Sequence, residues 1–306
     1  MESNQTISKE KLGFLGILKE AVKIPCKNPN FIILTCLTSL PLLYSLFLYE
    51  TLFMQTLTEA AKVLHKEGAE SLVAVDRLIG EVSHNILLLI LWHMGIIQLC
   101  DFFSTIVTVN SASIIHAGDH TLTLKEMFTK HFMESRLKGP LITSFYTLLL
   151  TSIVSVGLLS LLVYIYVLVN VRFMLMTFFM AMFVALSRLY LEWGAVWEMG
   201  TVISILEDKE GDVALVVAAY FSRGNRGTGI LLMACCHVWR LGLRIVCLFI
   251  AVDVVGGSKI LILVVQVCLV GLANIVKWVC FVVYYVDCRK KRLEKDAGGG
   301  QEVSSV

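Results

Sequence analysis

The feature that most constrains this chain is the apolar run from Ile86 to Val109, because it carries polar side chains at a length suited to crossing a bilayer. A membrane-spanning helix needs about 20 predominantly apolar residues. Within the run, Gln98, Asp101, Thr105 and Thr108 recur at steps of three or four, which places them on one helical face. A carboxylate on that face is costly in lipid. We therefore predict that this polar stripe packs against protein neighbours.

The composition predicts a membrane protein and argues against several other classes. Of the 306 residues, 57% are hydrophobic and only 16% are charged, which is far from the usage of a soluble domain. The formal net charge of +2 gives no reason to expect nucleic acid as a partner. The nine cysteines predict no disulfide framework. The contiguous trio Cys235, Cys236 and His237 lacks the spaced second pair of ligands that a zinc site needs, so we expect no metal and no cofactor.

Apolar runs of crossing length recur along the chain and predict an all-α, polytopic membrane helix bundle with six transmembrane helices. Residues 1–30 are expected to form a cytosolic, amphipathic and basic segment. Residues 287–306 are expected to form a basic stretch and then a disordered cytosolic tail. The long connection 50–85 is expected to include a surface helix. The predicted crossings are residues 31–49, 86–109, 141–169, 173–191, 229–255 and 260–285.

The charges between the crossings predict that both termini are cytosolic. An even number of crossings places alternate connections on the same side, and cytosolic connections carry an excess of lysine and arginine. Basic residues concentrate in the amino-terminal segment, in residues 125–138, at Arg223 and Arg226, and after residue 288. The opposite side receives the acidic connection 50–85. No apolar core precedes a small-residue cleavage site near the start, so no removable signal peptide is expected.

Two basic clusters are candidates for contact with anionic lipids at the cytosolic leaflet. In the first segment apolar side chains recur along one helical face while lysines step by four along another, as in a helix at a headgroup layer. The alternative is a lead-in helix that packs on the bundle without lipid preference. The second cluster follows the last crossing. The predicted interfacial residues are Lys19, Lys23, Lys27, Arg289, Lys290, Lys291 and Arg292.

Five polar side chains within the predicted crossings form a candidate intramembrane layer near the cytosolic side: Gln98, Asp101, Arg240, Arg244 and Lys277. One interpretation is structural, with the basic side chains reaching the headgroups and Asp101 pairing with one of them. The sharper hypothesis is a cytosol-facing cavity with an excess of positive charge that binds an anionic headgroup or a small anion. Arg240 and Arg244 lie one turn apart and repel, so they require an acid or an anionic ligand nearby.

Three stretches carry a resemblance to a known family. The run from Val196 to Gly211, followed by Arg223 and Gly224, resembles the signature of a plant family of six-helix, multi-pass membrane proteins without an established function. Leu12 to Glu20 resembles the amino-terminal start of that family, and Leu122 to Leu141 is similar too. The family usually has a lysine-rich run after the signature, where this chain has only the sparser stretch up to Arg226. The resemblance implies the fold and topology and supplies no catalytic residue.

Three classes of function fit these features. A non-catalytic endomembrane scaffold, or a protein that organises lipids, requires nothing that the sequence lacks and is our first expectation. A carrier or channel for a small anion or an anionic lipid is the alternative, prompted by Pro41, Asp101 and the intramembrane arginines. An intramembrane lipid enzyme is third. His93 and Asp101 lie about 80° apart on a regular α-helix, which is too far for a catalytic dyad, and His93 is interpreted as a side chain that packs between helices.

Partners and location follow from this reading only in outline. The expected partner is the lipid bilayer, with anionic lipids at the cytosolic leaflet, and the sequence names no protein partner. The expected location is the endomembrane system, meaning the endoplasmic reticulum or secretory pathway, or else the plasma membrane.

Overall fold

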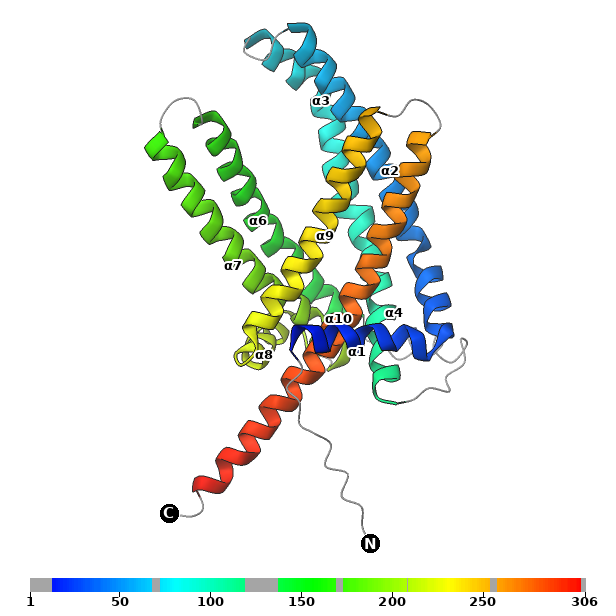
Figure 1. Ribbon diagram of the computed structural model, residues 1–306, viewed down its shortest axis with the longest axis vertical. Coiled ribbons are helices and arrows are strands. Elements are labelled where there is room, and N and C mark those ends of the chain that lie inside the picture. Colours follow the sequence, from blue (N-terminus) through cyan, green and yellow to red (C-terminus); the bar gives the residue numbers. More distant parts are fainter. Residues whose placement is uncertain are drawn as a thin grey trace.

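The structure is a computed structural model that describes residues 13–67, 72–118, 137–168, 173–207, 209–253 and 258–303. Every regular element in these ranges is a helix, and they contain no strand. This agrees with the sequence, because a backbone inside lipid must satisfy its own N–H and C=O groups. The helices, labelled in Figure 1 where there is room, are α1 (Phe14–Lys27), α2 (Pro29–Glu67), α3 (Leu72–Trp92), the π-helix η1 (His93–Ile97), α4 (Gln98–His116), α6 (Lys138–Leu168), α7 (Phe173–Leu206), α8 (Gly211–Ser222), α9 (Arg226–Asp253) and α10 (Ser258–Val303).

Six helical segments are long and apolar enough to cross a bilayer, which identifies the chain as an integral, multi-pass membrane protein. Each overlaps a run predicted from the sequence. Large apolar side chains on these segments, such as Phe145, Ile153 and Val238, are more than half exposed, as expected of a surface that meets lipid. The segments are Pro29–Val63, Ser83–His116, Lys138–Ile165, Met174–Leu206, Arg226–Cys247 and Ile260–Asp296.

The crossing helices run between two dissimilar ends of the molecule (Figure 1). One end carries the tips of the α2–α3, α6–α7 and α9–α10 hairpins. The other, which we call the terminal end, carries α1, α8 and the C-terminal part of α10 (Figure 1). Helix α1 and the C-terminal part of α10 therefore lie on the same side of the bundle, as an even number of crossings between them requires.

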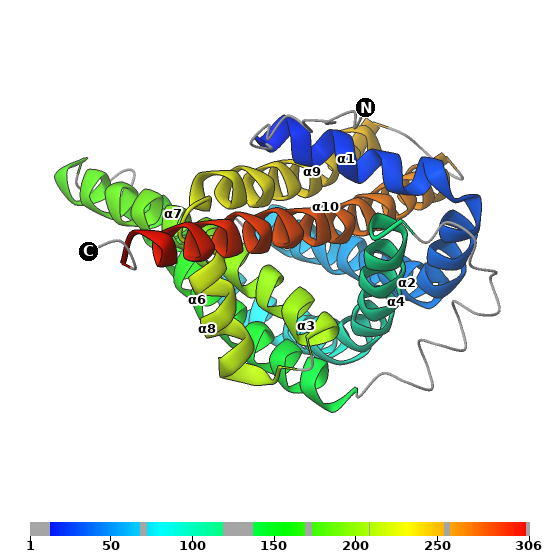
Figure 2. The same cartoon turned by 90° about the horizontal axis from the view of Figure 1, so that it is seen from below.

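Helix α10 is the centre of the packed core. Its residues from Trp278 to Tyr285 are buried on every side of the helix, and it packs against α1, α2, α4, α7, α8 and α9. Figure 2 shows α10 running through the middle of the molecule, with α1 and α9 on one side and α4 and α8 on the other. The core therefore lies mainly toward the terminal end, where Phe281 and Tyr284 are almost fully enclosed.

Helix α1 lies across the bundle because Asn28 and Pro29 end it and start α2. The side-chain Oδ1 of Asn28 accepts the backbone N–H of Asn30 at 3.0 Å, which caps the new helix, and proline is well suited to a first helical turn. The apolar face of α1, with Ile17 and Ile24, is buried against the bundle. The packing expected of a lead-in helix is therefore present, and the lysines of α1 remain exposed.

The crossings extend beyond the predicted runs in two places. The connection 50–85 contains no separate surface helix in its described part, because α2 and α3 continue through it as the arms of one hairpin. Helix α7 does not stop at residue 191 but continues to Leu206. The sequence prediction ended there because Glu192 and Glu198 look like the start of a polar connection, whereas the structure pairs both carboxylates with basic side chains of neighbouring helices.

The tail was expected to be disordered after its basic stretch, whereas α10 continues as a helix up to Val303 in the structure. Basic and acidic side chains one turn apart stabilise such an extension. Lys291 pairs with Asp287, and Nε of Arg292 lies 3.8 Å from Oδ1 of Asp296.

Gly211 starts α8 with a backbone that favours glycine, since its φ is +54°. Its N–H donates to Oγ1 of Thr143 at 2.9 Å, and this oxygen lies 2.9 Å from Oγ of Ser204. A Cβ added at Gly211 would also lie 3.3 Å from Cγ2 of Ile142. The turn thereby joins α6, α7 and α8.

We expect Gly211→Ala to destabilise the protein by about 1–2 kcal/mol, because an L-residue is strained in this conformation. Thermal unfolding of the purified protein in detergent measures the change. Gly224→Ala is the control, because a Cβ at that glycine meets no atom within 4 Å and its φ is not positive. Equal melting temperatures for the two variants would contradict the assignment.

Candidate functional site

A cavity of about 340 Å³ lies inside the bundle between η1 and helices α2, α4, α6, α7, α9 and α10. We call it the polar cavity, because charged and hydrogen-bonding side chains line it from most of these elements. Of the five residues in the predicted intramembrane layer, Gln98, Asp101, Arg240 and Lys277 lie on its wall, and Arg244 does not. Helices distant in sequence thus bring four predicted residues to one site.

Asp101 faces α10 from α4. Its Oδ1 accepts a hydrogen bond of 2.7 Å from Nδ2 of Asn274, and no basic side chain in the described part of the chain forms an ion pair with it. The structural interpretation that Asp101 pairs with one of the basic residues is therefore not what the structure shows. This hydrogen bond from an amide stabilises the carboxylate but supplies no positive charge to neutralise it.

Lys277 has an acidic partner that the sequence did not reveal. Its Nζ lies 2.9 Å from Oε1 of Glu198, and the two side chains are only 12% and 22% exposed. The pair joins α10 to α7 on the cavity wall. Glu198 lies beyond the predicted end of its crossing and within the run that resembles the family signature, which was the one signal in the sequence that pointed to it.

Arg240 lines the polar cavity from α9, one turn from His237. Among the described residues no carboxylate lies within ion-pair distance of its guanidinium. The cavity wall thus holds two acids, Asp101 and Glu198, and two bases, Arg240 and Lys277. The expected excess of positive charge is absent from the described wall for two reasons: Arg244 does not line this cavity, and Glu198, which was not foreseen, does.

Arg244 belongs to a second, mostly apolar cavity of about 490 Å³ between α2, α9 and α10. Its Nη2 donates to Oε1 of Glu50 at 2.9 Å, and its guanidinium lies 4.5 Å from the ring centre of Phe53. One turn of helix therefore separates Arg240 and Arg244 into different surroundings. Their mutual repulsion requires a nearby acid. Arg244 has one in Glu50 of α2.

Three buried polar atoms on the wall of the polar cavity have no hydrogen-bond partner among the described residues: Nδ1 of His93, Oγ1 of Thr105 and Nε1 of Trp278. Thr105 is 3% exposed and Trp278 is 4% exposed. Buried polar groups in native proteins nearly always bind something, and an unsatisfied one costs about 1–3 kcal/mol. Water or a polar ligand in the cavity would satisfy them.

The π-helix η1 interrupts the organising helix immediately before Gln98. A π-turn winds less tightly than an α-turn, so it rotates the residues before it relative to those after it. The separation of about 80° between His93 and Asp101 assumes a regular α-helix, and in the structure both line the same cavity. His93 packs its ring against Tyr49, with 5.6 Å between ring centres. Interruptions of this kind occur frequently at functional sites.

His237 extends the polar wall toward α7. Its Nδ1 lies 2.9 Å from the backbone oxygen of Met233, and its Nε2 lies 3.3 Å from the hydroxyl of Tyr190. Within the described ranges, no group of three or more His, Cys, Asp or Glu side chains is placed to hold a metal ion. Tyr190 and His237 thus add hydrogen-bonding side chains from α7 and α9 to the wall of the polar cavity.

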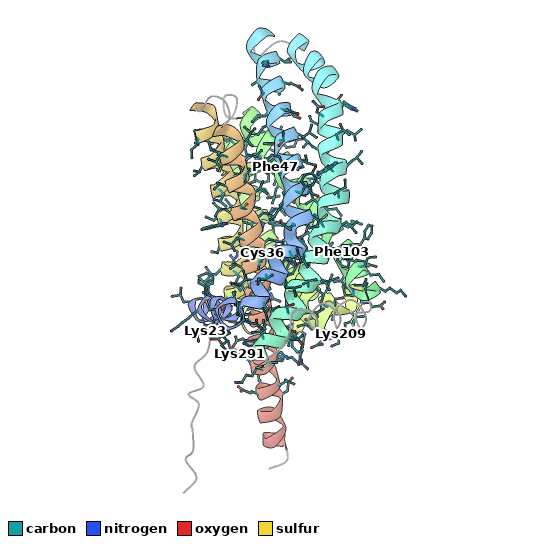
Figure 3. All side chains as sticks on the ribbon, turned by 90° about the vertical axis from the view of Figure 1, so that its right-hand side faces the viewer. Lys23, Cys36, Phe47, Phe103, Lys209 and Lys291 are labelled. Atoms are coloured by element: carbon teal, nitrogen blue, oxygen red, sulfur yellow. The ribbon has the colours of Figure 1, made fainter. Side chains whose placement is uncertain are left out.

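The predicted interfacial residues lie at the terminal end, where Figure 3 shows Lys23 and Lys291. Lys19, Lys23 and Lys27 are exposed on α1, with Lys23 paired to Glu20 at 2.7 Å. The second cluster is partly neutralised: Lys291 and Arg292 pair along α10, and Lys290 is exposed.

Arg289 lies close to the C-terminal end of α7. Its Nη1 lies 3.6 Å from Oε1 of Glu207, a carboxylate that also binds Lys209 and the hydroxyl of Tyr285. Burial raises the pKa of Glu207, but the hydrogen bonds from Lys209 and Tyr285 outweigh it and hold the pKa below its usual value. The carboxylate is thus kept charged, and less of the basic run is free to meet lipid.

Comparison with known proteins gives a family and no function. A family model described as a domain of unknown function, DUF8558, matches residues 1–295. No match was found among the curated proteins or among the solved structures.

We expect Glu198→Gln to destabilise the protein by about 2 kcal/mol, because it leaves the ammonium of Lys277 without its countercharge in a largely buried site. The measurement is the melting temperature in detergent. Glu192→Gln is the matched control on the same helix, since its partner Arg226 is 50% exposed and the pair is worth less than about 1 kcal/mol. A smaller effect for Glu198→Gln than for the control would show that the buried pair does not hold α7 to α10.

Proposed function

Since this chain belongs to the DUF8558 family, a domain of unknown function, we propose its role from the site: a non-catalytic carrier that binds a small polar solute in the polar cavity. The observation that carries the proposal is the set of unsatisfied polar atoms on the cavity wall, contributed by η1, α4 and α10. A scaffold needs close packing at this position and gains nothing from groups without partners. A binding site gains from them, because the ligand completes their hydrogen bonds.

Binding fits the wall better than covalent chemistry does. Its two carboxylates come from different helices, and α10 binds both: Lys277 pairs with Glu198 of α7, and Asn274 donates to Asp101 of α4. A general acid and base need titratable groups placed around a reacting atom, and the described contacts tie these groups to structural partners instead. We therefore assign the cavity a role in the selective binding and passage of a small polar solute.

The proposed topology places the terminal end in the cytosol. Lys23, Lys209 and Lys291 all lie toward this end (Figure 3), and cytosolic segments of membrane proteins are enriched in basic residues. The resemblance of the Val196 to Gly211 run to a plant family supports an endomembrane location, with the plasma membrane as the alternative. Localisation of a tagged full-length protein, with protease protection of the tag, tests both points.

A carrier exposes its site to each side of the membrane in turn, and this can be tested before the solute is known. The nine native cysteines are first replaced by alanine. Thr151, on the cavity wall of α6, is then changed to cysteine. We expect a membrane-impermeant thiol reagent to modify Thr151→Cys from either face of sealed vesicles.

The control for this labelling is Leu149→Cys on the same helix, because Leu149 is 48% exposed on the outer surface and should be shielded by lipid. Protection of Thr151→Cys from both faces would reject the carrier in favour of a sealed scaffold. Modification from only one face would indicate a receptor with a fixed opening.

A second candidate function, the organisation of anionic lipids, is favoured by the exposed face of α1. Lys19, Lys23 and Lys27 share that face with Leu15, which is 74% exposed although the opposite face of α1 is buried in the bundle. An apolar side chain beside lysines is typical of a helix at a headgroup layer. Each lysine near an anionic surface contributes about 1 kcal/mol.

We expect replacement of Lys19, Lys23 and Lys27 by glutamine to lower the amount of phosphatidylserine that copurifies with the protein several-fold, since the electrostatic attraction is removed. Lipid extraction and mass spectrometry give the measurement. Lys62→Gln is the control, because Lys62 is exposed on α2 near the opposite end. Unchanged lipid content in the triple variant would leave α1 as a packing element only.

A further inference from the structure

Two of the four charges on the polar cavity wall lack a countercharge among the described residues. Glu198 and Lys277 neutralise each other across 2.9 Å. Asp101 receives only the amide of Asn274, and Arg240 has no carboxylate partner. The wall therefore offers one free negative group on α4 and one free positive group on α9.

These two groups face a shared, small space. Both line the polar cavity, and His93 lies on the same wall. The volume of about 340 Å³ equals roughly ten water molecules at their bulk density. A molecule with a few carbon atoms and a charged group at each end fits this space.

The cost of uncompensated charge in a membrane interior determines which charges the ligand must carry. An uncompensated charge in a site of low polarity costs several kcal/mol, and removing one member of a pair is more costly than removing both. A simple anion would neutralise Arg240 and bring a like charge toward Asp101. A simple cation would neutralise Asp101 and bring a like charge toward Arg240. Only a molecule with both charges compensates both groups without adding net charge to the bundle.

We propose that the polar cavity binds a small zwitterion, with its ammonium group at Asp101 and its carboxylate or phosphate group at Arg240. This inference rests on the proposed function and names the chemical class of the solute. Tyr190 and Trp197 also line the cavity, with ring centres 6.4 Å apart. Trp278 also lines the cavity, and its indole N–H is buried and has no hydrogen-bond partner among the described residues.

The first experiment compares matched probes on the purified full-length protein in detergent. Glycine and 4-aminobutyrate are the zwitterions, acetate and butyrate are the anions of the same carbon chain, and methylamine and butylamine are the cations. We expect at least one zwitterion to raise the melting temperature in a concentration-dependent way, as a ligand of the folded state does. We expect its matched anion and cation to produce less than half of that shift. An equal shift from either single-charge probe, or no shift from any probe, overturns the proposal.

Two charge variants separate a binding role from a structural one. Asp101→Asn should abolish the zwitterion shift and create a response to the matched anion, because Arg240 is then the only unpaired charge. Arg240→Gln should abolish the zwitterion shift and create a response to the matched cation. Arg244→Gln is the control, since its partner Glu50 lies in the other cavity. A zwitterion shift that persists in both cavity variants contradicts the assignment.

The same chemistry is found in free solutes and in zwitterionic lipid headgroups, and a third arm distinguishes them. The protein is placed in nanodiscs of phosphatidylethanolamine or of phosphatidylglycerol, and the zwitterion shift is measured in each. Loss of the shift in phosphatidylethanolamine alone identifies the headgroup as the occupant, and an equal shift in both identifies a free solute. Labelling of Thr151→Cys from both faces would still support a carrier if the zwitterion assignment failed.

Discussion

The ion pair between Lys277 and Glu198 is the contact on which the arrangement of the bundle depends. It joins the central helix α10 to α7 in the interior of the protein, where a charge without its partner is costly. Around it, α10 packs against six other helices, and its segment from Trp278 to Tyr285 has no exposed side. The pair also removes two charges from the electrostatics of the polar cavity, so that the charges of Asp101 and Arg240 decide what the cavity can bind.

The terminal half and the hairpin half of the molecule serve different purposes. Toward the terminal end, α1, α4, α7, α8 and α10 form a continuous core, and the turn at Gly211 ties α6 and α7 to α8. Toward the other end, the helices present apolar side chains to their surroundings. The π-helix η1 adds a local irregularity on the wall of the polar cavity.

The two cavities show how one turn of helix can place two arginines in different surroundings. Arg240 and Arg244 differ by four positions on α9, yet one lines a charged cavity without a partner and the other forms an ion pair with Glu50 beneath the ring of Phe53. The second site is largely apolar, so the ion pair there stabilises the contact of α9 with α2. The two arginines are therefore distinguished by the presence or absence of a countercharge among the described residues.

The sequence by itself determined the number of crossings, the helical class and four residues of the polar cavity wall, because apolar runs of bilayer length and the spacing of Gln98 and Asp101 are local properties. It could not determine which charged side chains form ion pairs with one another. Glu198 and Glu50 looked like residues of polar connections, and only the approach of α7 and α2 to their neighbours made them partners of Lys277 and Arg244. The π-turn that brings His93 to the same wall as Asp101 was equally invisible, since helical periodicity assumes a regular helix. Tertiary structure decided which charges are cancelled, because cancellation depends on distances of a few ångströms between helices far apart in the chain.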